Sequence, residues 1–220
     1  MKTLLVTASS KTKIKTNETS FKRPNKTFYD SLNDNDKKSF FNARSMLLDE
    51  FGIKEGPDTH QGIDSTKSSI YLPAFLRYKG RTFSKVTSEA WNNLNSNPET
   101  FDCIILSAFY GLIRFEEPIR NYTIRQDTKM NSGKLISKYW RDQGAHEWLF
   151  EYIQKNNFDQ VKFVLSTEYS DIIGKDELIG KLKDELGIVG EDKQFKEGGG
   201  MKSMAFRGQY INDFLLGITK

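Results

Sequence analysis

The segment 106–114 combines residue types that can bind a ligand at the end of a buried strand. Ser107 and Tyr110 offer hydroxyl groups, and Gly111 permits a tight turn because glycine adopts backbone conformations that other residues avoid. Arg114 offers a planar guanidinium that binds a phosphate or a carboxylate through two parallel hydrogen bonds. The alternative is purely structural, with a serine at the strand end, a core tyrosine and an exposed arginine.

Polar residues follow two further apolar runs in the same way. Ser9 and Lys11 come after the first apolar run of the chain, and Ser166 and Glu168 come after a later one. In open α/β sheets, ligands bind beside the carboxyl ends of the strands. We therefore expect these side chains to share one cleft with those of the segment 106–114, where Glu168 would be the candidate acid or base.

Common catalytic and metal-binding signatures are missing from the sequence. The glycines 198–200 lack the Lys-Ser or Lys-Thr pair of a phosphate-binding P-loop. His60 and His146 are far apart, so neither a zinc site nor a Ser-His-Asp triad is expected. Cys103 is the one cysteine, which excludes an internal disulfide. We expect no metal and no cofactor.

Helical and strand patterns alternate along the chain, which predicts an α/β fold with a mixed, partly parallel sheet flanked by helices. We expect this fold to form a single compact domain over residues 1–220. The expected strands cover residues 4–6, 101–106 and 161–165. The expected helices cover residues 34–51, 83–94, 132–153, 175–186 and 203–216.

The composition is that of a globular protein. The chain has 220 residues, of which 37% are hydrophobic and 13% aromatic, enough for one sizeable core. The formal net charge of +4 permits an anionic partner without requiring one. No apolar stretch reaches the length of a membrane span, and the N-terminus lacks the apolar core of a signal peptide. We therefore expect a cytoplasmic protein with no membrane partner.

Several segments resemble, in the same order, motifs of the YaaA family of bacterial peroxide-stress proteins. The segment 106–114 resembles the family motif Leu-Ser-Gly-x-Tyr-Gly-x-Leu-Arg, with Ile113 in place of the leucine. The other matching residues are Lys11, Thr12, Lys79, Gly80, Phe83, Tyr122, Gly133, Lys134, Tyr139, Trp140, Asp142, Ser166, Glu168, Tyr169, Arg207 and Gly208.

The resemblance implies a YaaA-like fold, a role in protection against peroxide by limiting free iron, and DNA binding. The chain also departs from the family. Ala8, Ser9 and Ser10 stand where the family has Ser-Pro-Ala. Residues 30–66 lack the glycine-containing turn of the helix-hairpin-helix DNA-binding element that occurs in the family.

Our first hypothesis is a YaaA-like stress protein that binds DNA or a nucleotide-like small molecule in a basic cleft. Six basic residues are the candidate phosphate contacts: Lys11, Lys79, Arg114, Arg125, Lys202 and Arg207. Three tyrosines are candidates for stacking on a base: Tyr110, Tyr122 and Tyr169.

The alternative hypothesis is an enzyme that acts on a nucleotide or a nucleobase. Glu168 would then be the acid or base, and Ser107 and Tyr110 would orient the substrate. Lys11 and Arg114 would hold its phosphate. A third interpretation is an interaction module without chemistry.

Overall fold

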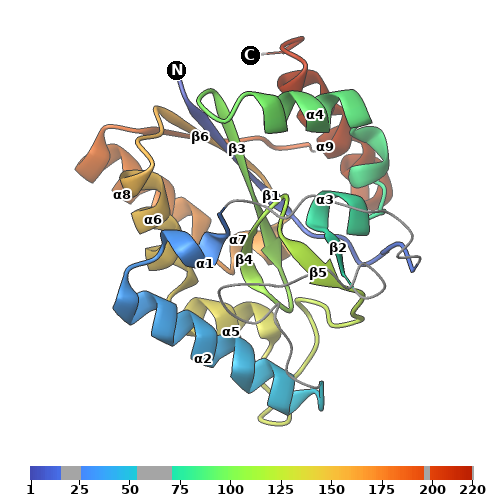
Figure 1. The fold of residues 1–220 in the computed structure, drawn as a ribbon, viewed down its shortest axis with the longest axis vertical. Helices are drawn as coiled ribbons and strands as arrows, with labels where there is room; N and C mark the ends of the chain where they lie inside the picture. Colours follow the sequence, from blue (N-terminus) through green and yellow to red (C-terminus); the bar gives the residue numbers. More distant parts are fainter. Residues whose placement is uncertain (16–25, 54–70, 196–198, 220) are drawn as a thin grey trace.

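The computed structural model describes residues 1–15, 26–53, 71–195 and 199–219, with the backbone alone at 199–201 (Figure 1). His60, Gly198 and the part of the segment 30–66 beyond Ile53 lie outside the described residues. Within the described ranges, no helix combines the length and the apolar character that crossing a membrane requires.

A five-stranded sheet forms the centre of the molecule. Its strands, in spatial order, are β4 (Gly111–Arg114), β3 (Phe101–Ser107), β1 (Thr3–Ala8), β6 (Gln160–Val164) and β7 (Val189–Asp192). Strand β4 runs antiparallel to β3, and the other neighbouring strands pair in parallel. The predicted α/β fold with a mixed, partly parallel sheet is therefore confirmed.

A small second sheet lies beside the first. It pairs β2 (Tyr71–Pro73) antiparallel to β5 (Pro118–Arg120). Together with β4, these strands were not expected from the sequence. Each is only three or four residues long, so its alternating pattern is too short to distinguish from a loop.

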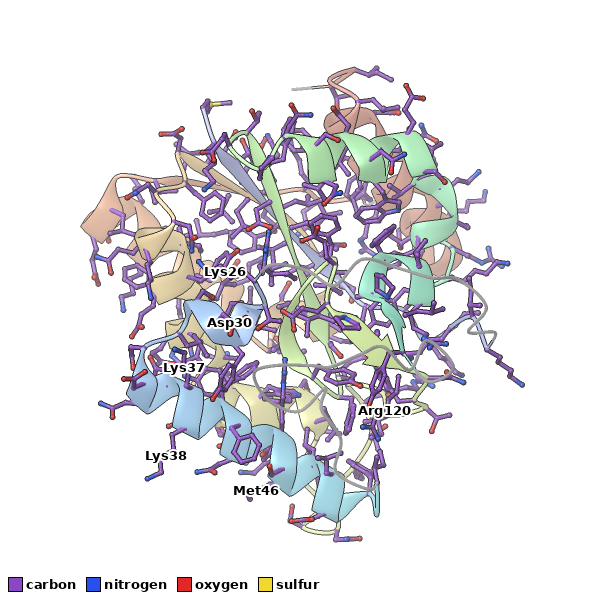
Figure 2. All side chains as sticks on the ribbon, viewed as in Figure 1. Lys26, Asp30, Lys37, Lys38, Met46 and Arg120 are labelled. Atoms are coloured by element: carbon purple, nitrogen blue, oxygen red, sulfur yellow. The ribbon has the colours of Figure 1, made fainter. Side chains whose placement is uncertain are left out.

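Helices cover both faces of the central sheet, with α6 and α8 on one side and α4 and α9 on the other (Figure 1). The helices are α1 (Phe28–Ser31), α2 (Asp34–Glu50), α3 (Ala74–Arg77), the 3₁₀ helix η2 (Phe83–Lys85), α4 (Ser88–Ser96), α5 (Ile136–Asp142), α6 (Ala145–Lys155), α7 (Thr167–Ser170), α8 (Lys175–Leu186) and α9 (Gly199–Leu215). The outer face of α2 carries Lys38 and Met46 (Figure 2).

Local capping explains where two expected helices are divided. The single helix expected at 132–153 is wrong, because Gly144 adopts a φ of +95° and separates α5 from α6. The helix expected at 83–94 is also divided. The Thr87 side chain accepts a hydrogen bond from the Ala90 amide at 3.2 Å and starts α4 afresh after η2.

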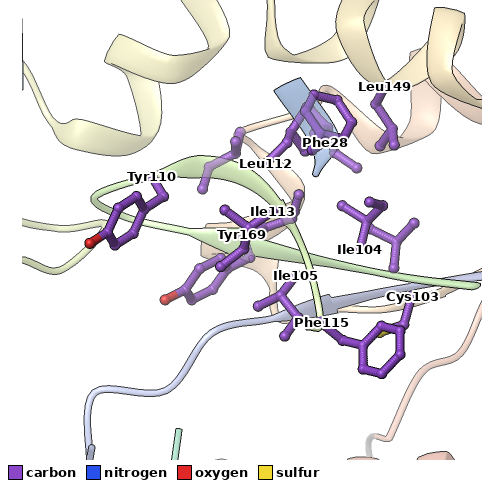
Figure 3. Packing of buried hydrophobic residues seen from close by; sticks show 14 of the residues in the cluster. Phe28, Cys103, Ile104, Ile105, Tyr110, Leu112, Ile113, Phe115, Leu149 and Tyr169 are labelled. Carbon is purple, nitrogen blue, oxygen red and sulfur yellow. The ribbon is translucent and has the colours of Figure 1, made fainter. Parts of the chain in front are cut away.

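The core lies on both faces of β3. Ile104 and Ile105 are both fully buried and point to opposite faces, as consecutive strand residues must (Figure 3). Ile104 lies on the side of Phe28 and Leu149, and Ile105 lies on the side of Phe115 (Figure 3). The sheet is thus fixed from both sides, which holds the strand ends in place.

Candidate ligand-binding site at the carboxyl ends of the strands

Three adjacent strands bring the expected serines to one edge of the sheet. Strand β1 pairs in parallel with both β3 and β6, so the carboxyl ends of all three lie at the same edge. Ser9 follows β1, Ser107 ends β3, and Ser166 follows β6. This is the edge at which open α/β sheets bind their ligands.

Ser107 is the centre of a buried hydrogen-bond network. Its Oγ lies 2.8 Å from the Tyr122 hydroxyl and accepts a hydrogen bond from the Tyr110 amide at 3.1 Å. The Tyr122 hydroxyl lies 2.6 Å from that of Tyr78, which also donates to Ser107 Oγ at 3.4 Å. Residues from three separate parts of the chain therefore meet at the end of β3.

A second pair of hydroxyls extends this network toward β6. The Tyr169 hydroxyl, from α7, lies 2.9 Å from Ser9 Oγ. The Ser9 side chain also hydrogen bonds to Tyr122, which joins the two parts. We refer to the five residues as the hydroxyl cluster: Ser9, Tyr78, Ser107, Tyr122 and Tyr169.

The phenols of the hydroxyl cluster stay neutral. Burial raises the pKa of Tyr78, of Tyr122 and of Tyr169 above the ordinary value of a phenol. They therefore keep their protons at neutral pH and act as hydrogen-bond donors and acceptors, not as bases.

Lys13 brings a positive charge to the hydroxyl cluster. Its Nζ lies 3.8 Å from the centre of the Tyr122 ring and donates a hydrogen bond to the Ser10 carbonyl at 3.0 Å. Burial, and then the charge of Arg77, lower the pKa of the Lys13 amine to about 8. The amine of Lys13 thus lies beside a neutral cluster, where its charge can attract an external anion.

The backbone around Lys13 is tied to the segment that carries Tyr78. The Ile14 amide donates to the Arg77 carbonyl at 2.8 Å, and the Lys79 amide donates to the Thr12 carbonyl at 2.9 Å. The fully buried Arg77 guanidinium donates to the Ile14 carbonyl at 2.6 Å. The loop after β1 is therefore held in one position.

Gly80 allows this loop to approach closely. A Cβ atom at position 80 would overlap Ser10 Oγ. Glycine at this position therefore lets the two segments touch without moving the Ser10 side chain, which fits the Lys79-Gly80 pair noted in the sequence.

Exposed basic residues lie on the two segments joined at Lys13 and on the helix that packs against the second of them. Lys11, Lys79 and Arg81 lie on the two joined segments, and Lys202 lies on α9. Helix α9 packs against η2, where the Thr82 hydroxyl donates to the Met204 carbonyl at 3.1 Å. None of the four basic residues forms an ion pair in the described part of the chain. We refer to these four residues as the basic rim: Lys11, Lys79, Arg81 and Lys202.

Two other predicted phosphate contacts have acidic neighbours. Arg125 forms an ion pair with Asp127 at 2.6 Å on the surface. Arg207 is half-buried, and the charges of Glu168 and Asp192 act on it. Both arginines are therefore partly neutralised, unlike the residues of the basic rim.

Arg114 lies away from the hydroxyl cluster. In the register of β3 and β4, Ser107 pairs with Gly111, whereas Arg114 pairs with Ile104, three residues back along β3. Its Nη2 lies 3.2 Å from Asp102 Oδ1. Its Nη1 donates to the Lys26 carbonyl at 3.0 Å. The structure does not bring Arg114 together with the other predicted site residues.

Tyr110 supports the turn after β3. Its hydroxyl accepts a hydrogen bond from the Arg120 amide at 3.1 Å, and its carbonyl accepts one from Arg44 Nε at 2.9 Å. Gly111 has a φ of +72°, and a Cβ there would lie 2.8 Å from the Trp140 ring. Tyr110 and Gly111 therefore position the end of β3 and do not reach outward.

Glu168 is exposed on α7 beside Tyr169. A hydrogen bond from Ser166 lowers the pKa of its carboxyl group, and the charge of Arg207 acts in the same direction. A general acid near neutral pH needs a raised pKa instead. The local chemistry of Glu168 is that of a charged surface carboxylate.

A pocket of about 350 Å³ opens beside the hydroxyl cluster, a volume within the range of small-ligand sites. Tyr122 borders both the cluster and this pocket. The lining residues among those described are Phe51, Ile53, Arg120, Asn121, Tyr122, Thr123 and Ile124.

Sequence reasoning missed Lys13, Arg77 and Tyr78. Tyr78 follows an apolar segment and carries no sign of a site in its sequence neighbours, and Arg77 is buried although arginine is usually exposed. The sequence did offer one signal for these residues, namely their closeness to predicted site residues. Lys13 lies two residues after Lys11, and Tyr78 directly precedes Lys79.

The chain is similar to proteins of one family. A family model described as peroxide stress protein YaaA matches residues 1–207. A UPF0246 protein of Francisella tularensis subsp. novicida is 27% identical over 112 residues, which cover 50% of this chain and 44% of the relative. A UPF0246 protein of Rickettsia bellii is 24% identical over 108 residues, which cover 48% of this chain and 42% of the relative.

The matched segment spans less than half the length of these curated relatives. The match to the family model is more extensive and includes the hydroxyl cluster, Lys13 and the basic rim, since all of these lie within residues 1–207. The chain therefore belongs to the peroxide stress protein YaaA family.

Proposed function

We propose that the protein acts in the peroxide stress response by binding a nucleic acid or a nucleotide through its phosphate groups. The observation that carries this proposal is the position of Lys13 beside the hydroxyl cluster, at the carboxyl ends of β1, β3 and β6, with the exposed basic rim on the adjoining segments. Membership of the peroxide stress protein YaaA family supports the cellular role.

The charges favour phosphate as the recognised group. Lys13 and the four residues of the basic rim have no carboxylate partner among the described residues, so their charges are available to an external anion. Lysine and arginine side chains bind nucleic acids mainly through their phosphates. Five such contacts are enough for measurable binding to a nucleic-acid backbone.

Base stacking contributes little to the proposed binding. Tyr110 is 1% exposed and Tyr122 is 6% exposed, so their rings are packed within the protein. The face of Tyr122 also carries Lys13. Recognition through phosphates without base contacts predicts a weak dependence on nucleotide sequence.

The enzymatic alternative with Glu168 as acid or base is weaker. Ser166 lowers the pKa of this exposed carboxyl group, whereas acid–base catalysis near neutral pH needs the opposite shift. If the site carries out a reaction, Lys13 is the better candidate.

Fluorescence anisotropy with a labelled single-stranded (dT)12 oligonucleotide tests the proposal. With about five phosphate contacts, the affinity should fall on the order of 10²-fold between 50 and 200 mM salt. Binding that hardly changes over this range would contradict recognition through phosphates.

A matched pair of charge reversals locates the binding surface. Lys79→Glu changes the basic rim, and Lys38→Glu makes the same change on the outer face of α2 (Figure 2). We expect Lys79→Glu to weaken binding about tenfold and to lower the salt slope by about one, with little effect of Lys38→Glu. Equal effects of both variants would place the binding surface elsewhere.

A further inference from the structure

Lys13 is half-buried and, unlike the buried lysines, has no carboxylate beside it among the residues that the structure describes. Lys162 pairs with Glu191, and Lys175 pairs with Asp192. The charged group that acts on Lys13 is instead a second cation, Arg77. Burial next to another cation is how proteins keep a lysine amine partly neutral and therefore nucleophilic.

The surroundings of Lys13 suit a reaction at its amine. The Nζ lies on the Tyr122 ring, 3.8 Å from its centre and 5.5 Å from the centre of Tyr78. The hydroxyls of both tyrosines are held in the hydroxyl cluster. Both phenols are buried and neutral, so they hold the rings in place against the amine and take no proton from it.

We propose that Lys13 is a nucleophilic amine that forms an imine with the aldehyde of a phosphate-bearing ligand. The inference rests on the proposed function, because the basic rim supplies the phosphate recognition. Lys79 is joined to the Lys13 loop through its hydrogen bond to Thr12 at 2.9 Å. A ligand phosphate on the rim would therefore lie near the amine that its aldehyde has to reach.

The reaction balances without an oxidant or a reductant. The Lys13 ammonium first loses a proton to water. The Nζ lone pair then attacks the carbonyl carbon, and the carbonyl π electrons move to oxygen, which takes a proton to give a carbinolamine. Loss of this hydroxyl with the remaining nitrogen proton releases one water molecule and leaves the imine.

Two sources share this chemistry, namely an abasic site in DNA and a free sugar phosphate. Sodium borohydride traps either imine as a stable amine on the protein, and peptide mass mapping identifies the modified lysine. The two probes are a single-stranded oligonucleotide with one abasic site and glyceraldehyde 3-phosphate. Acetaldehyde, which carries no phosphate, is the control for an unassisted reaction.

We expect trapping at Lys13 to exceed trapping at the exposed Lys38 by at least about tenfold at pH 8. An amine with a pKa of about 8 is half neutral at that pH, whereas an ordinary lysine is less than about 1% neutral. Adducts spread evenly over the surface lysines would overturn the inference. Stronger trapping by the oligonucleotide or by glyceraldehyde 3-phosphate identifies the source.

Lys13→Arg keeps the positive charge and removes the nucleophile. We expect this variant to lose the trapped adduct, while Lys38→Arg, the same change on the outer face of α2, leaves trapping at Lys13 unchanged. Unchanged trapping in Lys13→Arg would overturn the inference. If the wild type binds the oligonucleotide but no adduct is trapped, the imine proposal is wrong and the proposed function stands. If the wild type does not bind the oligonucleotide, the proposed function itself is wrong.

Discussion

A positively charged side chain lies near each end of β3, but the two differ in their neighbours. At the amino end, Arg114 lies 3.2 Å from Asp102, which also accepts a hydrogen bond from Tyr152. At the carboxyl end, Lys13 lies on the ring of Tyr122 and has no carboxylate partner among the described residues. A cation that has a buried carboxylate stabilises the fold, whereas a cation without one can attract an external anion.

The two ends of the segment 106–114 have different roles. Ser107 belongs to the hydroxyl cluster, and Gly111 allows the turn that follows it. Arg114 lies on β4 next to Asp102, near the amino end of β3. Burial acts to lower the pKa of the Arg114 guanidinium, and Asp102 raises it. A motif that is continuous in sequence thus serves the candidate site at one end and the stability of the sheet at the other.

Removing the arginine at the amino end should have the largest effect on stability. Arg114→Met leaves Asp102 buried without its cation, and we expect the free energy of unfolding to fall by about 3–5 kcal/mol. Urea unfolding measures the change. The control is Arg141→Met, which breaks an exposed pair with Glu177 and should cost about 0.5 kcal/mol.

Oligonucleotide binding by folded Arg114→Met should match that of the wild type. A variant that unfolds normally but no longer binds would show that Arg114 contacts the ligand, and the assignment of the two ends would then be wrong.

The turn between β3 and β4 should also be sensitive to substitution. Gly111→Ala puts a Cβ 2.8 Å from the Trp140 ring at a φ of +72°, and we expect a loss of about 3 kcal/mol. Gly133→Ala is the matched control, because Gly133 has a φ of +81° with no atom within 4 Å of the added Cβ. Its expected cost is about 1 kcal/mol from the backbone alone. Thermal melts that give equal losses would exclude packing against Trp140 as the cause.

Removing one tyrosine hydroxyl should weaken ligand binding only where the tyrosine belongs to the hydroxyl cluster, and not where it makes another buried hydrogen bond. Tyr122→Phe removes the hydrogen bonds to Ser107 and Tyr78, and Tyr139→Phe removes one to the Ala43 carbonyl. Each change should cost about 1 kcal/mol of stability. We expect only Tyr122→Phe to weaken oligonucleotide binding, about three- to tenfold, because Tyr122 supports Lys13.

The pH dependence of stability should reveal the titration of Lys13. Its pKa is about 8 in the folded protein, below the value of 10.5 expected when the chain is unfolded. Between pH 8 and 10.5 the unfolded chain binds more protons at this residue, so stability rises with pH. The wild type should therefore gain stability relative to Lys13→Met over this window. A constant difference between the two unfolding curves would mean that the amine titrates normally.

The regular elements could be predicted where local sequence determines them. The helix expected at 175–186 has the observed bounds, because Gly187 ends it in a left-handed conformation at a φ of +67°. The parallel strands β1, β3 and β6 could be predicted from their continuous apolar runs, whereas β7, whose sequence is Val-Gly-Glu-Asp, could not. The short strand β4 could not, because antiparallel pairing with β3 follows a turn of only a few residues and leaves little pattern.

The candidate site was predictable in outline and not in detail. The serines at the strand ends pointed to the edge of the sheet where the candidate site lies, and Lys11 and Lys79 are exposed. The surroundings of Lys13 depend on Arg77 and Tyr122, which are far from it in sequence and become neighbours only in the folded chain. The same is true of the pairing of Arg114 with Asp102, which requires the register of β3 and β4.

Amide chemical-shift mapping with the ¹⁵N-labelled protein and the (dT)12 oligonucleotide tests most directly which end of β3 binds the ligand. We expect the largest saturable shifts at residues 10–13 and 79–81, and little change around Asp102, Arg114 and Lys26. Shifts that concentrate around Arg114 and Lys26 would contradict the assignment of the ligand site to Lys13 and the basic rim.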